Sequence, residues 1–164
     1  MLSRTAEYLY WISRYMERAE TTARLLDVGY RMSLFPNPSG YNNEWESVLS
    51  AAGAIEGYKN KYDTIEQKNV EDFLFFDESN PSSVYNCILN ARNNALVVRT
   101  SFTPESWLAI NKTYQEILNL KEQKFTKSDL PDLTEWTIEQ VNLFRGSLSS
   151  CLLYTSDAAD DVHR

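Results

Sequence analysis

One stretch of this chain constrains its fold more than any other. From residue 3 to residue 32, apolar and small residues recur every three or four positions without a break. Residues spaced in this way lie along one side of an α-helix, which repeats every 3.6 residues. The pattern predicts a single long amphipathic helix that packs against other helices, with Ser3 as its N-cap. Its two apolar columns are Leu2, Leu9, Met16, Ala23 and Tyr30, and Ile12, Ala19 and Leu26.

Start and stop signals divide the following residues into five shorter helices. Two of these helices begin with a capping residue and a proline, Asn80-Pro81 and Thr103-Pro104, an arrangement typical of helix starts. Gly146 is predicted to end or bend the last helix. No segment has the two-residue period of a strand, so the sequence predicts an all-α antiparallel helical bundle. The five helices are predicted at about 43–52, 70–76, 81–98, 104–118 and 131–144, with a polar, poorly periodic stretch at 58–68.

We expect the end of the chain to differ in origin from the rest. Residues 151–161 resemble the peptide that a transposase sequencing adapter would encode if it were translated. We therefore expect residues 1–150 to be the natural part, a truncated bundle, and residues 151–164 to be a non-native read-through tail. The single histidine, His163, lies in this tail, which leaves the natural part without a Ser-His or Cys-His pair for nucleophilic catalysis.

Composition excludes several other classes of protein. The formal net charge of −7 is unlike that of a nucleic-acid binder, which usually presents a basic face. No apolar run is long enough for a transmembrane helix, and the N-terminus lacks the apolar segment of a signal peptide. The two cysteines stand far apart without a metal or redox motif, and we interpret Cys87 as a core residue. We expect a cytoplasmic protein without a metal ion or cofactor and without a nucleic-acid or membrane partner.

The long first helix carries an unusual set of charges on its other side. Glu7, Arg14, Glu17 and Arg18 fall within three turns, and aromatic residues flank them. Because little of the helix circumference is left for solvent, we expect Arg14, Glu17 and Arg18 to be at least half-buried. A buried arginine needs a carboxylate or an anionic ligand, and its fork-shaped guanidinium suits both.

The helix predicted from Pro81 adds a second set of polar candidates. Asn80 and Ser82 lie at its start, where backbone N–H groups could hold an anion or where the two side chains could serve as caps alone. Further along, Arg92 and Arg99 are seven residues apart and lie on one side, with Asn94 nearby. No glycine-rich phosphate loop occurs, so nucleotide binding by a known loop motif has no support.

These motifs together resemble the bacterial alpha-E domain family, a helical domain of unknown function named for its Glu-Arg motif. The resemblance rests on residues 1–11, 14–20 and 23–27, and it recurs at Phe76-Asp77 and at residues 80–83 and 91–95. It covers the chain from residue 1 to about residue 146. One departure is Asn93, where the family usually has an acidic residue, and this weakens any carboxylate role at that position.

The resemblance implies a domain about twice as long, of which residues 1–150 would be the N-terminal half and whose missing half carries a second Glu-Arg helix. It also implies partners, because genes of the family commonly lie beside ATP-grasp enzymes resembling peptide ligases and beside transglutaminase-like proteases. We favour a non-catalytic accessory or scaffold domain whose Arg/Glu helix organises the bundle interior. The alternative is a ligand-binding or catalytic domain, in which Arg14, Arg18 and Arg92 hold an anionic peptide-like substrate and Glu17 acts as a base or metal ligand.

Overall fold

The computed structural model describes residues 3–35, 43–123 and 129–161. Within these ranges the chain is all-α, with seven helices and no strand, as the sequence predicts. The elements are α1 (Ser3–Ser33), α2 (Asn43–Ala51), α3 (Ile55–Lys59), α4 (Gln67–Phe75), α5 (Val84–Val97), the 3-10 turn η1 (Arg99–Ser101), α6 (Pro104–Gln123) and α7 (Leu130–Asp161).

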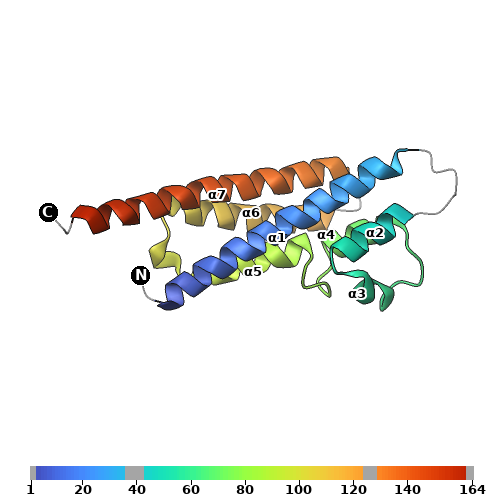
Figure 1. The fold of residues 1–164 in the computed structure, drawn as a ribbon, viewed down its shortest axis with the longest axis horizontal. Helices are drawn as coiled ribbons and strands as arrows, with labels where there is room; N and C mark the ends of the chain where they lie inside the picture. The colour runs from blue at the N-terminus through green and yellow to red at the C-terminus, as the bar shows by residue number, and fades with distance from the viewer. Residues whose placement is uncertain (1–2, 36–42, 124–128, 162–164) are drawn as a thin grey trace.

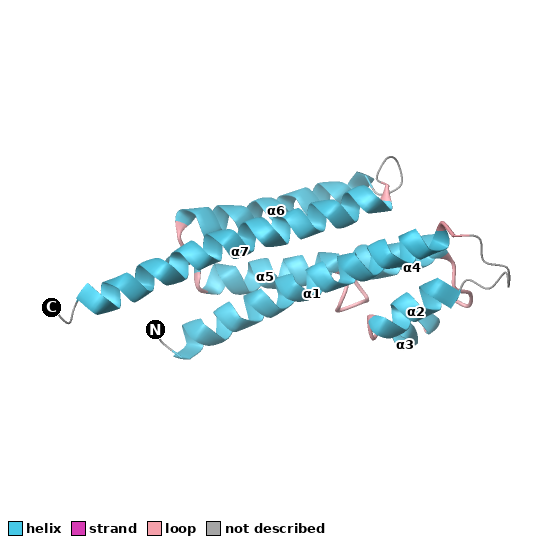
Figure 2. Ribbon diagram, turned by 45° about the horizontal axis from the view of Figure 1, so that its top comes forward, coloured by secondary structure: helices cyan, strands magenta, loops and turns pink. Residues whose placement is uncertain are grey.

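Four long helices form the body of the molecule (Figure 1). α1 packs against α5 and α7, and α6 packs against the same two helices, so the four close into a ring. Each runs antiparallel to its neighbours in the ring, which confirms the predicted antiparallel bundle. The short helices α2, α3 and α4 gather near the carboxyl end of α1 (Figure 2).

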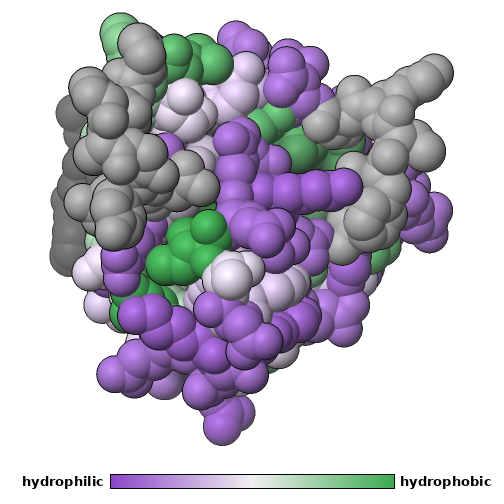
Figure 3. Space-filling view, turned by 90° about the vertical axis from the view of Figure 1, so that its right-hand side faces the viewer, coloured by the Kyte–Doolittle hydropathy of each residue, from purple (hydrophilic) through white to green (hydrophobic). Residues whose placement is uncertain are grey.

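The buried apolar residues form two clusters along α1. Ile12 and Met16 pack with residues of α5, α6 and α7 in the long part of the bundle. Ala19 and Leu26 pack with residues of α2 to α5 at the other end, where Trp45 is fully enclosed. The stripe predicted from the sequence is therefore the shared wall of both clusters. Seen from the α2–α4 end, the surface of the described residues is largely hydrophilic, with separate hydrophobic patches (Figure 3).

The start of α5 differs from the prediction at Asn80. The helix begins at Val84, and Ser83 is its N-cap, with Oγ accepting a hydrogen bond from the Asn86 backbone N–H at 3.2 Å. Asn80 is not a cap because its side chain serves a preceding turn instead. By contrast, Thr103 caps α6 as predicted, with Oγ1 accepting from the Ser106 N–H at 3.2 Å.

Of the two alternatives predicted at Gly146, a stop or a bend, the stop was wrong, because α7 continues through Gly146 to Asp161. Gly146 lies on the exposed side, where a helical glycine costs only about 1 kcal/mol and a long helix absorbs it. The predicted end of the natural part, residue 150, falls within α7, and the side chains from there on lie outside the described residues. Helix α3 was not predicted. It ends at Lys59, within the first residues of the polar stretch 58–68. None of the helices in the described ranges is long and apolar enough to cross a membrane.

Candidate functional site

An open cleft of about 500 Å³ lies on α1, where α2 ends and the loop before α5 passes. Three of the sequence-predicted site residues of α1 and one of the loop meet there. Thr21, Thr22, Leu25 and three residues at the end of α2 complete the lining. The lining residues are Arg14, Glu17, Arg18, Thr21, Thr22, Leu25, Ala51, Ala52, Gly53 and Ser82.

The expectation that Arg14, Glu17 and Arg18 are half-buried or more was wrong, because all three are exposed. The side of α1 that faces α5 and α7 is taken by the apolar stripe. Of the aromatic neighbours that were expected to cover the charges, Tyr10 and Trp11 are themselves exposed, and the half-buried Tyr15 packs against the core. Arg14 donates to Glu17 Oε2 at 2.6 Å, and their side chains remain 51% and 56% exposed. The Glu-Arg helix therefore does not organise the bundle interior with these residues.

The guanidinium of Arg18 has a different environment from that of Arg14. Its Nη1 lies 3.4 Å from Ser82 Oγ, and within the described ranges it forms no ion pair. Thr22, one turn along, donates to the Ser82 carbonyl at 3.4 Å and ties the same loop to α1. Arg18 thus stands between the open cleft and the loop with its charge uncompensated by a described carboxylate.

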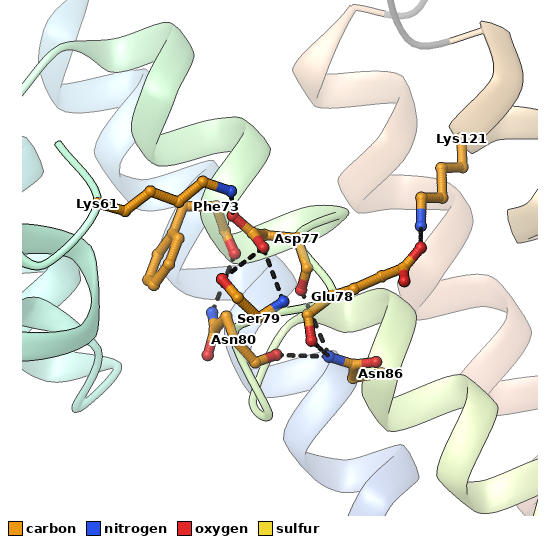
Figure 4. Close-up of polar contacts among 8 residues, drawn as sticks. All are labelled: Lys61, Phe73, Asp77, Glu78, Ser79, Asn80, Asn86 and Lys121. Carbon is orange, nitrogen blue, oxygen red and sulfur yellow. Dashed lines mark hydrogen bonds and ion pairs between the residues drawn. The ribbon is translucent and has the colours of Figure 1, made fainter.

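The loop that carries Ser82 is held by polar contacts on both sides (Figure 4). Asp77 Oδ1 accepts from the Ser79 N–H and hydroxyl, at 2.8 and 2.7 Å. Asn86 Nδ2 donates to the carbonyls of Glu78 and Asn80, at 2.9 and 2.8 Å. These bonds fold residues 77–83 into a compact turn against the start of α5.

Asn80 and two lysines complete this network. Asn80 is buried; its Nδ2 donates to the Phe73 carbonyl at 3.0 Å, and its Oδ1 accepts from the Ser82 N–H at 3.0 Å. Lys61 forms an ion pair with Asp77, and Lys121 of α6 forms one with Glu78 (Figure 4). Asn80 therefore positions Ser82 from behind and does not line the cleft.

The carboxyl group of Asp77 is buried and nevertheless keeps its negative charge. Its burial alone raises the pKa, but the hydrogen bonds from Lys61 and Ser79 outweigh this effect and hold the pKa of Asp77 below its ordinary value. The same contact with Asp77 raises the pKa of Lys61. The ion pair is thus a built-in part of the loop at neutral pH.

The other sequence-predicted candidates do not line the cleft. Glu7 is exposed near the start of α1. Arg92 faces α6, with its guanidinium 4.9 Å from the Tyr114 ring centroid and its Nε 3.4 Å from Asn111 Oδ1. Arg99 lies over the Trp107 ring at 4.9 Å, and Asn94 is half-buried on α5. The two arginines therefore contact aromatic rings of α6, Arg92 from α5 and Arg99 from η1.

Sequence reasoning did not single out several residues that build the site. Ala51, Ala52 and Gly53 reach the cleft only through the packing of α2 on α1, for which no local pattern exists. Asp77 could have been found, because an Asp or Asn that accepts from the N–H two residues on is a common turn. The spacing Asp77-Ser79 and Asn80-Ser82 fits that pattern twice in succession.

The thiol of Cys87 lies outside the cleft lining. Cys87 is fully buried, and burial raises the pKa of its thiol to about 12 against the opposing charge of Arg18. This agrees with its interpretation as a core residue, since the thiolate is the reactive form. Among the residues that the structure describes, no group of three or more His, Cys, Asp or Glu could hold a metal ion.

Comparison with known families places the cleft in context. A family model described as a predicted alpha-helical domain with a conserved ER motif matches residues 1–156. The chain belongs to the Alpha-E family. Glu17-Arg18 is the one Glu-Arg dipeptide in the 164 residues, so in this Alpha-E chain the motif lies at the cleft. No curated protein and no solved structure matches the chain.

Proposed function

We propose that this Alpha-E chain is a non-catalytic accessory domain that binds a partner protein of a peptide-forming system through its Glu-Arg cleft. The observation that carries the proposal is the place of the motif. It lies in an open cleft on the surface, with Arg18 forming no ion pair among the described residues. An arginine placed in this way contributes little to the fold and offers a strong donor to a carboxylate.

The proposed partner is an ATP-grasp enzyme that resembles peptide ligases, with a transglutaminase-like protease as a second member of the system. Both come from the gene context that family resemblance implies. The local charge supports contact with an anionic group, because Arg14, Glu17 and Arg18 give the cleft lining a net charge of +1 in a chain of −7. Local reversal of charge steers an acidic group of a partner to this place.

A second candidate function is the binding of a small anionic peptide-like ligand in the cleft itself. The volume of about 500 Å³ favours it, since ligand pockets commonly range from about 300 to 1,000 Å³. Catalysis by Glu17 has less support than binding. One oxygen of its carboxylate already accepts from Arg14 at 2.6 Å, and no described histidine or metal-binding cluster lies nearby to assist catalysis.

The test is a binding measurement between the purified chain and the ATP-grasp ligase-like protein of the same gene neighbourhood. Wild type is compared with Arg18→Glu and with Arg24→Glu. Arg24→Glu is the control, because it makes the same change of charge on α1. Arg24 lies outside the cleft lining and pairs with Glu20 at 2.7 Å. We expect a complex with wild type and Arg24→Glu and at least tenfold weaker binding with Arg18→Glu. Absence of any complex, with ligase activity indifferent to the chain, would contradict the proposal.

A further inference from the structure

The ligand chemistry of the cleft follows from its charges taken one at a time. Glu17 is neutralised by Arg14 at 2.6 Å, while Arg18 contacts Ser82 Oγ at 3.4 Å and no described carboxylate. One positive charge therefore remains for a ligand. A planar guanidinium forms two parallel hydrogen bonds with a carboxylate, and the Ser82 hydroxyl beside it adds a third donor.

A carboxylate fits this site better than a phosphate group does. A phosphate monoester carries a charge of about −1.5 to −2 at neutral pH, more than the single unpaired charge of the lining can balance. The carboxyl end of α2, which lies at the cleft, also repels a doubly charged anion. Ala51 is the last residue of α2, and the carboxyl end of a helix carries a partial negative charge. That end favours N–H donors on the ligand.

Besides the polar Thr21 and Thr22, the remaining lining residues are apolar or small. Leu25 lies on the α1 side, and Ala51, Ala52 and Gly53 lie on the α2 side. Gly53 lies in the turn after α2 with a φ of +65°, and apart from its chain neighbours no atom lies within 4 Å of the place where its Cβ would be. The cleft is thus open beside this turn, with room for a small apolar side chain next to the carboxylate.

We propose that the cleft binds the free C-terminal carboxylate of a peptide whose last residues are small and apolar. Arg18 and Ser82 hold the carboxylate, the peptide N–H groups face the carboxyl end of α2, and the terminal side chain lies against Leu25 and Ala52. This inference rests on the proposed function, because it names the chemical group through which the accessory domain would hold a substrate or a partner's terminus.

The inference is tested by titrating the protein with N-acetyl-trialanine as the free acid and as the C-terminal amide. Binding is followed by the chemical shifts of amides in residues 14–25 and 51–53. We expect the amide to bind at least tenfold more weakly than the acid, since a charged hydrogen bond is worth about 1.5–3 kcal/mol. Equal binding of acid and amide, or no binding of either, overturns the inference, as does tighter binding of inorganic phosphate than of the acid.

Three variants separate the site from general charge effects. Arg18→Gln is expected to weaken binding of the acid at least tenfold, and Ala52→Leu to weaken acid and amide alike by filling the apolar side. Arg24→Gln removes the same charge outside the lining and is expected to change binding less than threefold. An Arg18→Gln protein that is folded by circular dichroism and binds as wild type does overturns the role given to Arg18.

The outcome is separable from that of the proposed function. If no peptide binds but the ligase complex still depends on Arg18, the cleft meets a folded partner surface, and the carboxyl-terminus inference alone fails. If the acid peptide binds through Arg18 but no ligase complex forms, the partner proposal fails and the inference stands.

Discussion

Asp77 and Arg18 show how differently two charged residues of one site relate to the fold. Asp77 is 7% exposed, its carboxylate accepts hydrogen bonds from Lys61 and Ser79, and it helps to hold the loop that carries Ser82. Arg18 is exposed and has the hydroxyl of that loop as its contact at 3.4 Å. The first residue acts on stability and places the loop; the second is available to a ligand.

Asp77→Asn is expected to lower the free energy of unfolding at pH 7 by about 1–2 kcal/mol, because it removes the ion pair with Lys61 but keeps an oxygen for Ser79. The native pKa of Asp77 lies below that of the unfolded chain, which is about 3.9. The stabilisation is therefore complete above about pH 5 and is lost as pH falls through the native pKa.

Urea denaturation of both proteins between pH 7 and pH 3 checks this expectation. The difference between wild type and Asp77→Asn should shrink toward acid pH. A difference that stays constant or grows as pH falls would show that the loss has another cause than the charge.

Four of the nine candidates predicted from the sequence line the cleft, but the exposure of the charged ones was not readable from the sequence. The heptad-like column shows which α1 residues face the core, and it left Arg14, Glu17 and Arg18 outside the stripe. Whether another helix covers that outer side depends on the packing of α2 and α5, which no periodicity within α1 records. Aromatic neighbours misled us, since Tyr10 and Trp11 are 58% and 46% exposed.

At the scale of elements, the two helical glycines in α1 and α7 illustrate opposite constraints. Gly29 is buried where α1 meets α2, and a Cβ there would lie 2.7 Å from Val48 Cγ2 and 3.0 Å from Trp45 Cζ3. Gly146 lies on α7 with nothing within 4 Å of the same position. The first glycine permits a close approach of helices, and the second is a weak point in a helix.

Gly29→Ala and Gly146→Ala are therefore expected to change stability in opposite directions. Alanine favours a helix over glycine by about 0.5–1 kcal/mol, and Gly146→Ala should gain this amount. At Gly29 the same gain is outweighed by overpacking against the stiff Val48 side chain, which typically costs about 1–3 kcal/mol.

Thermal unfolding of the two variants gives the measurement, with each serving as the control for the other. A rise in melting temperature for Gly29→Ala would contradict the close packing of α1 on α2. A fall for Gly146→Ala would contradict its open surroundings.

Element boundaries were predictable where a single local rule decides them. Thr103-Pro104 starts α6 as expected, because both hydrogen-bond partners of the threonine hydroxyl, the Ser106 N–H and hydroxyl, lie in the first turn of the same helix. Asn80-Pro81 has the same appearance, but Phe73 and Ser82 claim the asparagine side chain, and the cap moves to Ser83. The sequence therefore predicted a capped helix start correctly but placed the cap three residues too early, because Asn80 bonds to Phe73 instead.

Across the whole molecule, Glu20 links the first helix of the bundle to the last. Its carboxylate accepts from Arg24 at 2.7 Å and from Arg145 of α7 at 2.8 Å, and it is 12% exposed. Burial raises the pKa of Glu20, but the two arginines outweigh burial and lower it below its ordinary value. The contact spans 125 residues of sequence, so no spacing rule could have predicted it.

Glu20→Gln is expected to cost about 1 kcal/mol at pH 7, since each exposed arginine partner contributes less than a buried one. This contribution is present above the pKa of the unfolded chain and is lost as pH falls through the lower native pKa. A double-mutant cycle with Arg145→Gln isolates the link between α1 and α7. A coupling free energy indistinguishable from zero would show that this ion pair does not help to close the ring.

The central claim is that the Glu-Arg motif of this Alpha-E chain serves binding and not the fold. Its most direct test is the free energy of unfolding of Arg18→Gln by urea denaturation at pH 7. The exposed position of Arg18 predicts a change within about 0.5 kcal/mol of wild type, the usual range for surface substitutions. A loss of about 3 kcal/mol or more, as when one partner of a buried ion pair is removed, would contradict the account.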